Sequence, residues 1–124
     1  DRGQPRLRAC AVSDLGGTQT FSPESLGAIE RPMLVYGAPV PGSDIDLDVE
    51  SRALVAALPD TVATYHEPAG LAHFDFLGLC TEAGLGILLE EEPADAIVCT
   101  DARETRAAEH DRIIGEVAAF FAAN

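Results

Sequence analysis

A histidine that follows a short strand is the residue in this sequence best suited to chemistry. His73 comes after a small-residue turn, Pro68–Ala72, and before an aromatic–acid–aromatic step, Phe74–Phe76. Just upstream, the stretch Thr61–His66 (TVATYH) predicts a short β-strand. Many hydrolases keep their general base in the loop after a late strand, although a lone histidine is more often a core or surface residue. Catalysis by His73 therefore depends on partners elsewhere in the chain.

The other titratable residues of this kind have simpler explanations. Asp75, two positions after His73, is expected to hydrogen-bond the backbone of the turn. His66 lies inside the predicted strand and His110 on the polar side of the last predicted helix, so both are expected to be packed or surface residues. No cysteine and histidine group has metal-ligand spacing, and we expect neither metal nor cofactor.

The elements that must position His73 are strands and helices that alternate along the chain. Apolar runs predict strands at 7–13 and 33–37, in addition to 61–66. Helices are predicted after a Ser22 cap with Pro23 in the first turn, over 44–58, as a short helix or lid over 81–90, and over 101–121. This order favours an α/β fold with parallel strand pairing.

The two longer predicted helices have distinct signatures. Helix 44–58 begins with three aspartates, Asp44, Asp46 and Asp48, which would complement the dipole of its first turn. The last helix carries an apolar stripe, predicted to consist of Ile113, Ile114, Val117, Phe120 and Phe121. The acidic stretch 90–95 between them is expected to be a solvated loop.

Composition excludes several classes of partner. The 124 residues are 47% hydrophobic, enough for one domain or part of one. The 21 acidic residues outnumber 8 basic ones, all arginine, for a net charge of −13. Such a surface repels nucleic acid and anionic membranes, and no apolar run is long enough to span a membrane.

Three cysteines leave the compartment open. Cys10 lies in the first apolar run and is expected in the core. Cys80 and Cys99 flank an irregular acidic segment and could pair in an oxidising compartment, or remain two free thiols. Pairing would indicate a secreted or periplasmic protein, and free thiols a cytoplasmic one.

Three parallel strands make a poor independent domain, because both faces need cover and an edge stays open. We therefore expect this chain to be the second half of a larger domain. It begins with Asp1 rather than methionine, which indicates a processed, truncated or excised chain.

Five segments together resemble the C-terminal half of an α/β-hydrolase. They are LRACAVSDLGG (7–17), FSPESLGAI (21–29), RPMLVYG (31–37), LVAALP (54–59) and PAGLAHFDFLGLC (68–80). The nearest groups are bacterial dienelactone-hydrolase-like proteins and the branch of platelet-activating-factor acetylhydrolases and cutinase-like polyester hydrolases. The resemblance covers nearly the whole chain and is strongest around His73. It implies hydrolysis of a small ester or lactone without a cofactor.

The family's triad runs in the order serine, acid, histidine, with the serine in a G-x-S-x-G elbow. That motif is absent from this sequence and would lie upstream. The resemblance thus implies that this chain holds the last two members, with His73 as base. The serine would come from the N-terminal half, joined covalently or present as a separate chain.

The acid of the triad has several candidates. Most relatives place it after the second of these strands, in a pattern G-x-x-D, but here that position is Val40. Asp14 ends the preceding strand, where the acetylhydrolase branch places its acid, and is the favoured candidate. Asp44 or Asp46 could instead reach back from the longer loop. A structural role for Asp14, capping a turn, is the simpler explanation.

A different function remains open on sequence grounds. The missing G-x-x-D acid favours a non-catalytic α/β-hydrolase-like module that kept the scaffold as a binding or scaffold protein and lost the chemistry.

Overall fold

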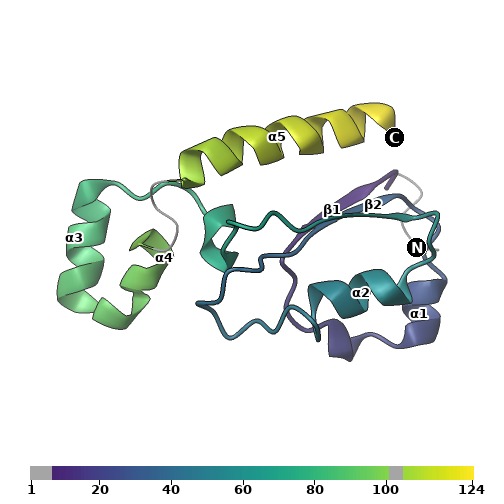
Figure 1. Cartoon of the computed structure of the whole chain (residues 1–124), viewed down its shortest axis with the longest axis horizontal. Coiled ribbons are helices and arrows are strands. Elements are labelled where there is room, and N and C mark those ends of the chain that lie inside the picture. The colour runs from purple at the N-terminus through teal and green to yellow at the C-terminus, as the bar shows by residue number, and fades with distance from the viewer. Residues whose placement is uncertain (1–6, 101–104) are drawn as a thin grey trace.

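A small parallel sheet with helices on both faces forms the centre of the molecule. The computed structural model describes residues 7–100 and 105–124. Its strands, β1 (Cys10–Ser13), β2 (Met33–Tyr36) and β3 (Ala63–His66), are parallel and in the order β1-β2-β3. Figure 1 shows α1 (Pro23–Gly27) and α2 (Ser51–Ala57) on one side of the sheet and α5 (Arg106–Ala123) on the other. The predicted α/β architecture is confirmed at this level.

Two apolar clusters fill the two faces of the sheet. The first lies towards α1 and α2 and contains Leu26, Met33, Val35, Leu54, Leu58 and Val62. The second lies towards α5 and contains Leu34, Tyr36, Leu71 and Ile113. All of β2 is buried, and its successive side chains alternate between the two clusters, as the period of two in a strand requires.

The register brings the carboxyl ends of the three strands to one edge. Ser13 is level with Tyr36, and Tyr36 with His66. The chain segments that leave the strands therefore start side by side. After β2, Val40 forms an isolated parallel bridge with Ala72, the residue before His73.

The α1 start agrees with its sequence signature. Ser22 is the N-cap, its Oγ accepts a hydrogen bond from the Ser25 amide over 3.2 Å, and Pro23 follows in the first turn. A serine cap satisfies one of the amides that the first helical turn leaves unpaired.

The predicted boundaries of α2 were wrong. The helix begins at Ser51, not at residue 44, and no acidic residue lies in its first turn. The Asp46 carboxylate accepts hydrogen bonds from the amides of Asp48 and Val49 instead. Such local bonds let an aspartate compete with helix formation. The strands are also shorter than predicted, with β1 starting at Cys10.

A helical hairpin lies beyond one end of the sheet, in the part of the chain between β3 and α5 (Figure 1). It comprises α3 (Glu82–Glu91), a 3-10 turn η3 (Pro93–Ala96) and α4 (Ile97–Thr100), so helical structure replaces much of the loop predicted over 90–95. A disulfide joins Cys80 to Cys99 across its base. No residue of α3 is buried. The hairpin is thus a disulfide-linked extension that does not belong to the core. The remaining cysteine, Cys10, is a free thiol that packs against the first cluster.

The buried stripe of α5 is narrower than predicted. Ile113, Val117 and Phe120 contribute to the second cluster, whereas Ile114 and Phe121 are 65% and 47% exposed. With about 100° of rotation per residue, both exposed residues lie roughly 80–100° around the helix from Ile113. Positions 101–104, where the helix was predicted to start, lie outside the described residues. No described helix is long and apolar enough to cross a bilayer.

Candidate active site

Asp14 and His73 are in direct contact at the carboxyl edge of the sheet. The Asp14 Oδ2 atom lies 2.8 Å from Nδ1 of His73, across 59 positions of sequence. The aspartate is 2% exposed, and the histidine side chain is 30% exposed. Asp14 follows β1 directly, and His73 opens the 3-10 turn η2 (His73–Phe76) beyond β3. The edge of the sheet thus presents a buried acid hydrogen-bonded to a partly open imidazole.

The backbone at Asp14 adopts a left-handed conformation. Its φ is +42°, the only positive value at a non-glycine residue in the described chain. A left-handed residue costs about 1–2 kcal/mol, although aspartate tolerates this region better than most. The Asp14 amide still donates to Tyr36 O over 2.8 Å, which continues the pairing with β2. The chain therefore leaves the sheet abruptly at the residue that carries the carboxylate.

The second oxygen of Asp14 is held by two donors. Oδ1 accepts hydrogen bonds from the Ala38 amide over 3.0 Å and from the Ser51 hydroxyl over 3.2 Å. Ser51 is fully buried at the start of α2. One oxygen is thus anchored to the scaffold, and the other is directed at His73.

Glu50, next to Ser51, fixes the segment that follows Asp14. Its Oε2 accepts a hydrogen bond from the Thr18 amide over 2.6 Å, and its carbonyl oxygen accepts from the Thr18 hydroxyl over 3.1 Å. Hydrogen bonds from the amides of Thr18 and Gly17 lower the pKa of the Glu50 carboxyl. Two adjacent residues at the start of α2 therefore hold this segment: Ser51 bonds Asp14, and Glu50 bonds Thr18.

The turn that carries His73 has its own buried anchor, Asp75. Its Oδ2 accepts a hydrogen bond from the Ala72 amide over 2.8 Å, so the predicted backbone bond is confirmed. Its Oδ1 pairs with Nε of Arg106 at 3.1 Å, and both side chains are at most 2% exposed. Arg106 also donates to Val98 O over 2.7 Å, and His110 Nε2 lies 2.6 Å from Asp75 O. These contacts tie η2 to α5 and to the hairpin.

His66 packs against the ring of Tyr36, with ring centroids 5.4 Å apart. Burial, and then the hydrogen bond to Glu116, raise the pKa of Tyr36. His66 is thus a packed residue, as the sequence indicates.

His73 opens onto a cavity of about 400 Å³. Its lining consists of Gly42, Ser43, Asp44, Ile45, His73, Phe74, Ala94 and Ile97. Asp44, the alternative acid, thus shares the cavity with His73, but within the described residues neither it nor Asp46 hydrogen-bonds the imidazole. Of the candidate acids, the structure brings Asp14 into contact with His73.

Several supporting residues were missed at the sequence level. Arg106 lies seven positions before Ile113, which places it on the same face of α5, so an arginine on the apolar stripe was a detectable signal. Ser51 gave no such signal, because its role depends on a hydrogen bond across 37 positions.

No group of three or more histidine, cysteine or acidic residues in the part of the chain that the structure describes could hold a metal ion.

Comparisons with protein-family models, curated proteins and solved structures find no match.

Proposed function

We propose that this chain supplies the histidine and the acid of a serine-type hydrolase that cleaves carboxylic esters or lactones. The observation that carries the proposal is the 2.8 Å contact between buried Asp14 and partly exposed His73. On this proposal the fold is the C-terminal half of an α/β-hydrolase domain, of the dienelactone-hydrolase, acetylhydrolase or cutinase-like kind.

The contact sets the roles of the two ring nitrogens of His73. A carboxylate can only accept a hydrogen bond, so Nδ1 carries the proton in the neutral ring and Nε2 keeps a lone pair. Nε2 makes no hydrogen bond within the described residues. It is therefore free to take the proton from a serine hydroxyl and return it to the leaving alcohol, while Asp14 stabilises the imidazolium.

The nucleophile is proposed to come from a segment beyond this sequence. Among the described strands, β1 pairs with β2 alone, so its other edge has backbone groups available to a further strand. Ser43 lines the His73 cavity, but its Oγ accepts a hydrogen bond from the Ile45 amide over 3.3 Å and makes none to His73. An N-terminal half docked at β1, covalently or as a separate chain, would bring the serine.

The disulfide between Cys80 and Cys99 supports a location outside the reducing cytosol. We propose that the protein is secreted or periplasmic.

A fluorophosphonate probe on the complete protein tests the proposal. We expect labelling of one serine, lost in His73→Ala and retained in His66→Phe, which keeps an aromatic ring against Tyr36. This chain alone should not be labelled. Labelling of the isolated chain that Ser43→Ala removes would contradict an external nucleophile. No labelling of the complete protein would favour the alternative, a binding or scaffold module without catalysis.

A further inference from the structure

The cavity beside His73 has walls from three separate parts of the chain. The loop after β2 contributes residues 42–45, the histidine turn contributes Phe74, and the helical hairpin contributes Ala94 and Ile97. Small and apolar side chains dominate this lining. A cavity of this chemistry suits the short hydrocarbon part of a ligand.

The hairpin wall is fixed rather than loosely attached. Arg106 is 1% exposed and joins Asp75 of the histidine turn to Val98 O of α4, next to Ile97. The Cys80–Cys99 disulfide closes the base of the same hairpin. These contacts hold the hairpin side of the cavity against the histidine turn.

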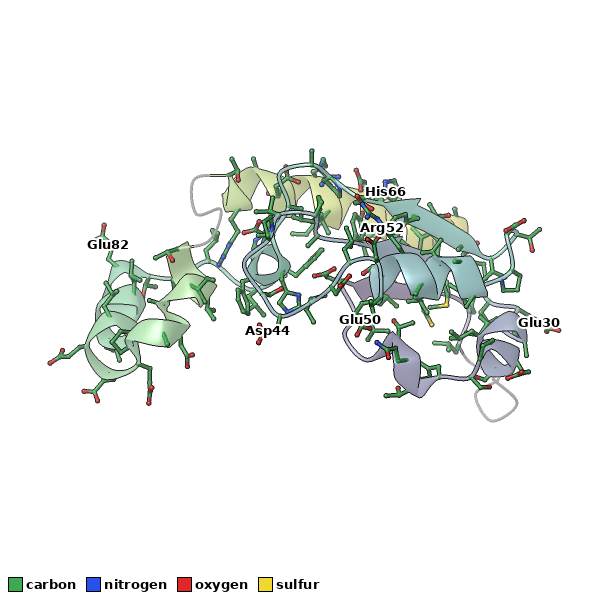
Figure 2. All side chains as sticks on the ribbon, turned by 60° about the horizontal axis from the view of Figure 1, so that its bottom comes forward. Glu30, Asp44, Glu50, Arg52, His66 and Glu82 are labelled. Atoms are coloured by element: carbon green, nitrogen blue, oxygen red, sulfur yellow. A yellow bond between two sulfur atoms is a disulfide. The ribbon has the colours of Figure 1, made fainter. Side chains whose placement is uncertain are left out.

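Asp44 is the one acidic residue among the described residues that line this cavity. It lies on the loop that joins β2 to α2, and Figure 2 shows this loop on the side of α2 that is nearer to the hairpin. Within the described residues no arginine or other group pairs with it. Asp44 is solvent-exposed, so it adds a negative charge at the rim of the cavity that no described residue pairs, in a chain whose net charge is already −13.

We propose that this cavity binds the uncharged part of an ester and that Asp44 makes it reject esters that carry a carboxylate. The inference rests on the proposed function, and it adds the substrate class and a specificity-determining residue. Two like charges about 4 Å apart in water repel enough to change affinity about fivefold. The overall negative field acts in the same direction.

Two esters that differ in one group test the proposal on the chain as it is. Ethyl butyrate and the monoethyl succinate anion have similar size, but the second carries a carboxylate in place of the terminal methyl. Each is titrated at about pH 8, where carboxylates are ionised, while amide NMR shifts are followed. We expect ethyl butyrate to shift the amides of Phe74, Ala94 and Ile97, and monoethyl succinate to bind about fivefold more weakly at low salt.

Asp44→Asn should bring the two affinities closer together, and about 1 M salt, which screens exposed charges, should do the same. Asp46→Asn is the matched control, since Asp46 lies two positions away and outside the cavity lining, and it should keep the difference. Equal binding of both esters to the unmodified chain would overturn the role of Asp44. No shift at the lining amides would overturn the cavity as the binding site. Neither result affects the serine labelling through which the proposed triad is judged.

Discussion

The Ser51 hydroxyl donates a hydrogen bond to Oδ1 of Asp14 over 3.2 Å, on the carboxylate oxygen that does not face His73. The first residue of α2 thereby orients the acid at the end of β1. In a triad the acid orients the base, and here Ser51 in turn orients the acid.

Ser51→Ala should therefore weaken both stability and function. A hydrogen bond to a charged group contributes about 1.5–3 kcal/mol, so the free energy of unfolding should fall by about 2 kcal/mol. Labelling of the complete protein should slow because the acid is less constrained. Ser25→Ala, at an exposed serine of α1, is the matched control. Unchanged stability and labelling rate in Ser51→Ala would show that this bond orients nothing.

Substitutions of Asp14 should separate its chemical role from its structural one. Asparagine accepts hydrogen bonds and tolerates a φ of +42°, so Asp14→Asn should stay folded. Its amide would donate to Nδ1 and place the ring proton on Nε2, with an expected loss of roughly 10³–10⁴ in turnover of the complete enzyme.

Asp14→Ala should instead unfold more easily. It leaves the buried hydroxyl of Ser51 and the amide of Ala38 without an acceptor and puts a Cβ-bearing apolar residue in the left-handed region. We expect a loss of about 2–4 kcal/mol in chemical denaturation. Equal stability of the alanine and asparagine variants would argue against this anchoring role.

Glu50 should contribute to the acid sensitivity of the fold. Its pKa in the folded chain is lowered from 4.5, first by the Thr18 amide and then by the Gly17 amide. A lowered folded pKa gives stability that is complete above the unfolded value and lost as the pH falls through the folded one. The unfolding free energy should therefore drop more steeply below about pH 4.5 in the native chain than in Glu50→Gln. Parallel pH profiles would contradict this contribution.

Reduction of the Cys80–Cys99 disulfide should loosen the hairpin and spare the sheet. The two cysteines are 19 positions apart, and closing a loop of that length stabilises by about 3 kcal/mol in the chain-entropy model. Because α3 has no buried residue, its amides should lose protection in hydrogen exchange while those of β2 do not change. An equal loss of protection in β2 would show that the hairpin belongs to the core.

Local sequence patterns predicted the strands and helices better than they predicted the hydrogen bonds that hold Asp14. Apolar runs of strand length gave β2 and β3, and a serine–proline pair gave the start of α1, because these depend on neighbouring residues. The start of α2 was missed because the Asp46 carboxylate bonds the backbone in place of a helical turn. The geometry around Asp14 depends on contacts with Ala38 and Ser51, which no periodicity records. Asp14 was favoured as the acid through the family resemblance, not through spacing.

The protonation of the His73 ring tests the central claim most directly. Nitrogen-15 NMR of the ring distinguishes a protonated nitrogen from one with a lone pair, and the chain has 3 histidines, assignable with His66→Phe and His110→Gln. In the neutral form of the ring, we predict a proton on Nδ1 of His73 and a lone pair on Nε2, with the two exchanged in Asp14→Asn. A proton on Nε2 of the neutral ring in the unmodified chain would contradict the account, because Nε2 would then have no lone pair to accept the proton of a serine hydroxyl.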